Sequence, residues 1–259
     1  MKRILVISDL HCGSLVGLTP PSDQSSKDTK WGKTQRTCWD FYKKQVNLFK
    51  PYDVVIVNGD AVHGDAKKDG GTMLITTDRV EQAEMAAKCI IEPDCNVVRL
   101  TYGTPFHTGN QEDFEGIIAM SLRATGMDAK ICSHGFYSIG GKNFNVKHKV
   151  ASSGVSYGRL TPVAKEINWN RAWAARGEEA KADVLIRSHV HYFGEVKLDG
   201  CVGITTPSLQ GLGDKYGSRQ CSGTVDFGIV VIDILDDGIV IVRERLMGGT
   251  CQAHTSELL

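Results

Sequence analysis

Short apolar runs alternate along this chain with segments in which apolar residues recur at helical spacing. Runs such as Ile4–Ile7 and Val54–Val57 are apolar at every position, which is typical of strands buried on both faces of a sheet. Runs of this kind, and alternating ones, predict strands at Arg3–Ser8, Asp53–Asn58, Asn96–Tyr102, Phe136–Ile139, Asn143–Val150, Val184–Arg187, Gly194–Leu198, Val202–Thr205, Phe227–Ile234 and Ile239–Leu246.

Four segments have the apolar spacing and the end signals of helices. Pro51 follows the first segment and cannot continue a helix, whereas Thr161-Pro162 places a proline in a first helical turn. Gly13–Lys30 and His63–Met73 lack such spacing and are predicted to be long loops, which in a compact domain are usually functional. The predicted helices are Thr34–Phe49, Thr77–Ile91, Glu112–Thr125 and Thr161–Ala180.

The order of these elements predicts the fold class. Strands alternate with helices in the first half of the chain, and antiparallel strands dominate the second half. This order favours an α/β protein with a two-sheet β-sandwich flanked by helices, and a plain doubly wound sheet is the alternative. We expect residues 1–247 to form a single domain and residues 248–259, which have no periodic pattern, to form a loose tail.

Composition narrows the class of protein. The formal net charge is +0 and the pI about 7.1, so the whole molecule has no electrostatic attraction to nucleic acid or anionic membrane, although a local basic groove is still compatible with these values. The chain enters its first strand directly after Met1-Lys2-Arg3, without a signal-peptide pattern, and no apolar run is long enough to span a bilayer. We therefore expect a cytoplasmic protein with mostly free thiols among its 8 cysteines.

Carboxylates and imidazoles stand where several predicted strands end. Open α/β sheets bind ligands outside the carboxyl ends of their strands, so side chains far apart in sequence can meet at one edge. Oxygen and imidazole donors without thiolate suit Mn, Fe or Zn. The candidate metal ligands are Asp9, His11, Asp60, His148, His189 and His191.

Each of these units alone has a simpler explanation. Asp9 and His11 could be a polar strand end facing water, Asp60 a turn residue after Gly59, and His148 a hydrogen-bonded strand histidine. The fixed order of all the units is what favours a metal centre.

That order resembles the calcineurin-like metallophosphoesterase family, whose pattern is D-x-H, G-D-x-x-D, G-N-H-D/E, a single His and G-H-x-H. The resemblance covers roughly residues 3 to 207. The long loop after His11 and the Gly-Thr-x-x-His form also resemble phage-encoded members. The corresponding motifs here are Asp9-Leu-His11, Gly59-Asp60-Ala-Val-His63, Gly103-Thr-Pro-Phe-His107, His148 and Ser188-His-Val-His191.

Three positions depart from the family pattern. Ser188 replaces a glycine, and His63 replaces an aspartate that in the family supports its loop. The third motif lacks the asparagine that in the family binds the second metal. Thr104, Asn110 or His107 could replace it, and the choice among them stays open.

The resemblance implies a fold, a chemistry and residue roles. It implies two divalent ions about 3.5–4 Å apart, with Mn as first choice and Fe, Zn, Ni or Mg as alternatives. The first ion would bind Asp9, His11 and His191, the second His148 and His189, with Asp60 bridging. His107 would be the catalytic residue, as general acid to the leaving oxygen, or else a metal ligand.

The implied activity is hydrolysis of phosphodiester bonds in a phosphoester substrate, with nucleotides or nucleic acid favoured and no membrane partner. A phosphomonoesterase is the alternative among enzymes. The altered third motif also keeps a degenerate, non-catalytic metal-binding interaction protein as a rival. Arg159 and Lys149 are candidate phosphate contacts or simply surface charges.

Overall fold

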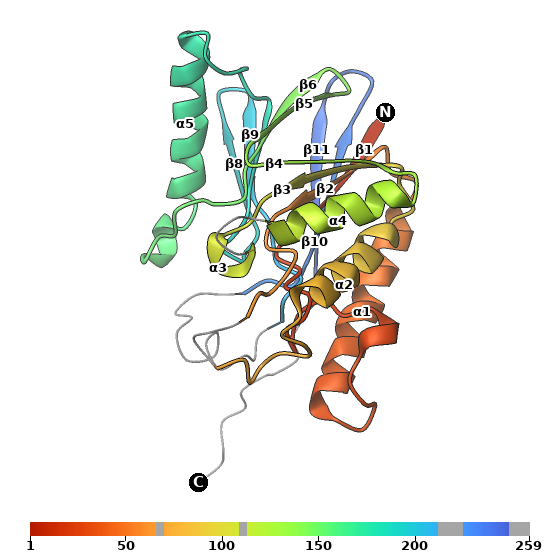
Figure 1. The fold of residues 1–259 in the computed structure, drawn as a ribbon. Coiled ribbons are helices and arrows are strands. Elements are labelled where there is room, and N and C mark those ends of the chain that lie inside the picture. The colour runs from red at the N-terminus through yellow and green to blue at the C-terminus, as the bar shows by residue number, and fades with distance from the viewer. Residues whose placement is uncertain (66–69, 109–112, 212–224, 249–259) are drawn as a thin grey trace.

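The computed structural model describes residues 1–65, 70–108, 113–211 and 225–248, and they form two sheets flanked by helices (Figure 1). One sheet has the order β11 (Val240–Leu246), β10 (Gly228–Ile234), β1 (Lys2–Ile7), β2 (Val54–Asn58), β3 (Val97–Thr101), β4 (Asp128–Cys132). The other has the order β5 (Gly135–Ile139), β6 (Lys142–Val146), β7 (Val184–Arg187), β9 (Cys201–Thr205), β8 (Gly194–Leu198).

Helices cover the outer face of each sheet (Figure 1). On the first sheet they are α1 (Lys30–Phe49), α2 (Arg79–Ile91) and α4 (Asp113–Ala124), and on the second α5 (Thr161–Ala175). The remaining short helices are α3 (Pro105–Thr108), η1 (Pro21–Asp23) and η3 (Ser156–Gly158). The predicted two-sheet sandwich is confirmed, and the alternative of one doubly wound sheet is wrong.

The apolar core is divided by the sheets. Ile56 of the first sheet packs with Phe144 and Ile186 of the second in a buried cluster between the two sheets. On the outer side of the second sheet, Ile167 of α5 packs with Leu185. The strands that precede the site run parallel within each sheet, β1 with β2 and β6 with β7, so their carboxyl ends share an edge.

The predicted elements match the observed ones with a few corrections. Helix α1 begins at Lys30 rather than Thr34, because the Thr29 side chain caps it by accepting a hydrogen bond from Gly32 N. Helix α5 ends at Ala175 rather than Ala180, where Gly177 takes a left-handed φ of 75°. Strand β6 ends at Val146, so His148 lies beyond it rather than within it. Strand β4 and helix α3 were not predicted.

The structure tests some of the remaining expectations, on the thiols and on membrane spans, and leaves the domain limits and the tail untested. Cys12, Cys89, Cys95, Cys132 and Cys201 are free thiols, as predicted. In the described part of the chain no helix has the length and apolarity to cross a membrane. The single domain at residues 1–247 stays a prediction, and nearly all of the predicted tail lies outside the described residues.

We predict that Ile56→Ala destabilises the protein by about 2–5 kcal/mol, because it leaves a cavity between two sheets that cannot close over it. Ile56 is 0% exposed, whereas Ile239 is 54% exposed. Ile239→Ala is therefore the matched control and should change stability by less than about 0.5 kcal/mol. Urea unfolding of both variants measures the difference, and equal losses would contradict the assigned core.

Candidate metal centre

The structure brings all six predicted ligands to one edge. Asp9 and His11 follow β1, Asp60 follows β2, His148 follows β6, and His189 with His191 follow β7. They form two clusters in which one ligand atom per residue lies within 4.8 Å of the others. The first group is Asp9, His11 and His191, and the second group is Asp60, His148 and His189.

Close contacts define each group. In the first group, His191 Nε2 lies 3.1 Å from Asp9 Oδ1 and 3.3 Å from His11 Nε2. In the second group, His148 Nε2 lies 3.1 Å from Asp60 Oδ2. A hydrogen bond joins the two groups, because the His189 backbone N–H donates to the Asp9 side chain at Oδ2, at 3.3 Å. The two carboxylates thus each face imidazoles at the junction of the two sheets.

The backbone at the ligands is strained. Seven non-glycine residues of the described chain have positive φ, and five of them are predicted ligands. Residues other than glycine rarely adopt this left-handed region of backbone conformation. Such strain clusters at functional sites, where the surrounding structure enforces it. The five ligands are Asp9, His11, Asp60, His189 and His191, with φ of 49°, 45°, 49°, 75° and 55°.

Two buried ligand atoms have no hydrogen bond. Asp9 Oδ1 and His148 Nε2 lack a partner of suitable angle among the described residues, although the opposite groups are 3.1 Å away. His148 Nδ1 donates to Asn58 O at 2.7 Å, so Nε2 is the nitrogen that offers a lone pair to a metal once its proton is displaced. Unsatisfied buried donors and acceptors are costly, and a cation would satisfy both atoms. The donor set therefore fits a divalent metal.

Burial and neighbouring charges shift the titration of these groups. Burial alone would lower the pKa of His148, but the Asp60 carboxylate raises it to about 10. Burial opposes ionisation of Asp60, yet the His148 imidazolium holds the pKa of Asp60 well below its usual range. In the first group, Asp9 raises the pKa of His191 against burial in the same way. Burial lowers the pKa of His11 well below its usual value, and the nearby His107 and His191 lower it further.

Thr104 contacts Asp60 where the family has its asparagine. Thr104 N donates to Asp60 Oδ1 at 2.6 Å, and its hydroxyl lies 3.2 Å from Oδ1 and 3.3 Å from Oδ2. Thr104 therefore supports the carboxylate as a hydrogen-bond donor. The preceding Gly103 has no room for a side chain, since a Cβ there would lie 2.1 Å from Asp60 Oδ1. Asn110, the other candidate, lies outside the described residues.

Glu115 is a buried residue beside the ligands that the sequence did not indicate. It reaches from α4 to accept hydrogen bonds from Ala61 N at 2.7 Å and Gly103 N at 2.6 Å. One carboxylate thus holds the loops after β2 and β3 together. Burial, with the charge of Asp60, raises the pKa of Glu115 to about 8. No local pattern in the sequence marks Glu115, because both of its backbone partners lie in loops that are distant along the chain.

A belt of buried polar side chains lies beneath the ligands and joins the two sheets. Ser188 Oγ lies 2.6 Å from Thr206 Oγ1, which in turn lies 2.7 Å from Ser8 Oγ. Asn58 Nδ2 donates to Ser188 Oγ at 2.6 Å, and Thr101 donates to Asn58 Oδ1 at 2.6 Å. Ser188, which replaces the family's glycine, is thus the junction between the sheets.

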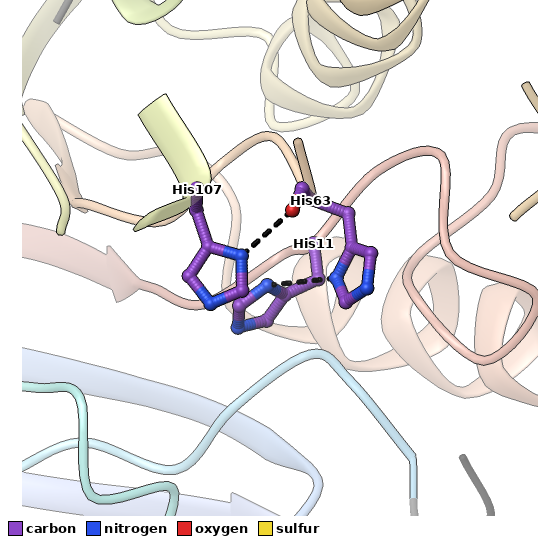
Figure 2. Close-up of side chains that lie close together, drawn as sticks. All are labelled: His11, His63 and His107. Atoms are coloured by element: carbon purple, nitrogen blue, oxygen red, sulfur yellow. Dashed lines mark hydrogen bonds between the residues drawn. The ribbon is translucent and has the colours of Figure 1, made fainter. Parts of the chain in front are cut away.

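His107 lies in the short helix α3, an element that the apolar pattern did not predict. Its Nδ1 donates to His63 O at 2.7 Å (Figure 2). Its Nε2 lies 4.0 Å from Asp60 Oδ2. His63 lies next to it and is buried, and burial lowers the pKa of His63 to about 3. Pro105 opens α3, where its fixed φ suits a first helical position.

Of the two candidate phosphate contacts, Arg159 is held beside the site. Its guanidinium stacks 4.3 Å from the centroid of the Tyr192 ring and donates to Phe193 O at 3.0 Å. Tyr192 directly follows the ligand His191. Lys149 follows His148 and is exposed. Arg159 is thus fixed on the two residues that follow His191 in the chain.

Comparison with solved structures identifies the fold. An archaeal phosphodiesterase matches with a TM-score of 0.51 at 14% identity, over 95% of this chain and 99% of that one. Chaetomium thermophilum Vps29 matches with a TM-score of 0.47 at 11% identity, over 95% and 98%. Zinc-complexed Vps29 from Entamoeba histolytica matches with a TM-score of 0.45 at 13% identity, over 94% and 98%. No protein-family model and no curated protein matches the chain.

At these identities the likeness is one of fold. The chain has the calcineurin-like metallophosphoesterase fold, in agreement with the resemblance carried by its motifs. The narrower resemblance to phage-encoded members stays a prediction.

We predict that metal affinity rises with pH and that binding releases protons. Because the pKa of His148 is raised from 6.5 to about 10, its ring carries a proton at neutral pH that a metal must displace. The Mn²⁺ dissociation constant should fall by about tenfold per pH unit for each displaced proton between about pH 6 and 8. Isothermal titration calorimetry in buffers of different ionisation enthalpy counts the protons.

The stability of the metal-free protein should fall as pH rises, whereas its metal affinity should rise. A raised folded-state pKa stabilises the fold below the unfolded value of 6.5, and this stabilisation is lost as pH rises through about 10. The Tm of the metal-free protein should therefore fall over that range, and His148→Asn should flatten the dependence. A pH-independent affinity together with an unchanged Tm would contradict the His148–Asp60 pairing.

Proposed function

We propose that this protein is a binuclear metal-dependent phosphoesterase that hydrolyses phosphodiester bonds of nucleotides or nucleic acid. The observation that carries the proposal is the pair of carboxylate–histidine groups at one buried edge, each with a ligand atom that lacks a hydrogen bond. The fold, shared with an archaeal phosphodiesterase, supports it. We keep the cytoplasm as the proposed location.

In this proposal the first group holds one divalent ion and the second group another. Bound ions would supply charge stabilisation for a phosphate and acidify a water molecule. Asp60 is placed to serve both ions, because it contacts His148 and lies beside the loop of Asp9 and His11. His11 N donates to Asp60 O at 3.0 Å and Asp9 N to Gly59 O at 3.0 Å, which fixes the two loops together. Mixed oxygen and imidazole donors make Mn the first choice.

His107 is proposed as the general acid. Its Nδ1 is fixed on His63 O, so the ring is oriented with Nε2 toward Asp60 and the cluster of ligands. In the protonated ring, Nε2 can donate its proton to the leaving oxygen while Nδ1 keeps its bond to the carbonyl. Side-chain exposure of 16% leaves the ring within reach of a substrate.

The experiment that tests the proposal is hydrolysis of an aryl phosphodiester with Mn²⁺, compared between the wild type and Asp60→Asn. Asn keeps the shape of the side chain but removes the charge that faces both groups, so activity should fall by more than about 100-fold. The loss should also exceed that of His148→Ala at saturating metal. Asp40→Asn, an exposed carboxylate on α1, is the matched control and should keep full activity.

The outcome separates the rival functions. Turnover of a phosphomonoester in place of diesters would favour a phosphatase. Binding of two ions without turnover of cyclic nucleotides, DNA, RNA or aryl esters would favour a non-catalytic protein. If His148→Ala is inactive while Asp60→Asn keeps most activity, the shared role of Asp60 is wrong.

For His107→Ala we predict a loss that depends on the leaving group. A general acid matters most for a poor leaving group, so an alkyl phosphodiester should slow by roughly 10²-fold or more, and a nitrophenyl ester much less. Metal content, measured by elemental analysis, should stay the same. Equal losses on both substrates with one ion missing would instead make His107 the substitute for the family's asparagine ligand.

A further inference from the structure

Three imidazoles from separate segments converge next to the first group, and we call them the histidine triad (Figure 2). His11 follows β1, His63 lies in the loop after β2, and His107 lies in α3. Ring centroids are 5.3 Å apart for His11–His63, 4.4 Å for His11–His107 and 5.3 Å for His63–His107. One nitrogen of each ring lies within 4.8 Å of the others.

The position of His63 is fixed by its surroundings. Its backbone N–H donates to Cys12 O at 3.0 Å and lies 3.1 Å from Gln82 Oε1. The fully buried Gln82 also accepts from Gly64 N at 2.8 Å and donates to Gly64 O at 2.9 Å. A Cβ at Gly64 would lie 2.7 Å from His107 O, so this loop packs directly on α3. His63 and His107 are therefore held in place relative to each other.

The ring nitrogens of the triad are arranged as a set of donors. His107 Nδ1 bonds to His63 O, which leaves Nε2 with the lone pair of the neutral ring. His11 turns Nε2 toward His191 at 3.3 Å and Nδ1 toward His63 Nδ1 at 3.3 Å. In a tetrahedral site with metal–nitrogen bonds of about 2.0–2.1 Å, two nitrogens are about 3.3–3.4 Å apart. The 3.3 Å distance between His11 Nδ1 and His63 Nδ1 therefore equals the distance between two nitrogen ligands of such a site.

We propose that the histidine triad is a third metal-binding site, with a preference for Zn²⁺ or Cu²⁺. Its donors are three imidazoles without a carboxylate, whereas the two other groups each combine one carboxylate with two imidazoles. Imidazole-rich sets suit Zn and Cu, and oxygen-rich sets suit Mg and Mn. The two kinds of site thus differ in the metal they select.

Occupation of the triad and of the first group is mutually exclusive. A neutral imidazole has one lone pair, and His11 presents a different nitrogen to each group. A metal in the triad therefore removes His11 from the first group, and it also occupies His107. Zn²⁺ bound there inhibits the activity proposed above, a consequence that rests on the proposed function, whereas metal binding itself does not.

The test is the number of nitrogens that couple to one equivalent of Cu²⁺ added to the metal-free protein. Pulsed electron paramagnetic resonance should detect three histidine nitrogens in the wild type. A Cu²⁺ ion in the first group or in the second group would couple to only two, because each of those groups contains two histidines. His63→Asn should reduce the count to two. His134→Asn, which changes a half-buried histidine bonded to Asn145 outside the triad, is the matched control and should keep three.

Two results would overturn the proposal. Two nitrogens in the wild type would place Cu²⁺ in the first or the second group of ligands. His63 would then be a residue that only orients His11. Three nitrogens retained in His63→Asn would show that another imidazole completes the set. If the protein is active, the Zn²⁺ concentration that halves its Mn²⁺-dependent rate should rise by about tenfold in His63→Asn relative to His134→Asn.

Discussion

Two carboxylates, Asp9 and Asp60, are buried to 0% and 1% exposure at the junction of two sheets, and this burial is the constraint on which the site depends. An ionised carboxylate without a counter-charge is very costly in such a place. Here each faces an imidazole at 3.1 Å, and the carboxylates raise the pKa of His148 and of His191, so these rings can supply the counter-charge. A divalent ion that displaced such a proton would supply the counter-charge for the carboxylate in its place.

The frame around these charges resists relaxation. Left-handed backbone at five of the six ligands would relax if the loops were free, but backbone bonds tie the β1 loop to the β2 loop. Glu115 ties the β2 loop to the β3 loop, and the belt through Ser188 ties both sheets together. Positioning of this kind is what keeps ligands in place before the metal arrives. The left-handed backbone at these residues is therefore held by hydrogen bonds between several loops.

Much of this arrangement could be predicted from the sequence. The apolar runs located most strands, and the rule that ligands collect at carboxyl ends placed all six candidate residues at one edge. The contribution of Glu115 could not be predicted, since it depends on α4 crossing both loops, a tertiary contact with no local signal. The helical position of His107 was missed for a similar reason. The four residues of α3 are too few to show apolar periodicity.

The departures from the family pattern act together on the donor set. Thr104 N donates to Asp60 Oδ1, so that oxygen is engaged and Oδ2 is the one that faces His148. An asparagine side-chain carbonyl would donate a lone pair to the metal. Thr104 instead donates a hydrogen bond to the Asp60 carboxylate and withdraws electron density from it. At the same time His63 adds an imidazole beside His11 in place of a carboxylate. His63 therefore adds a nitrogen beside His11, outside the first group, and near Asp60 Thr104 does not supply the carbonyl oxygen that the family's asparagine would supply.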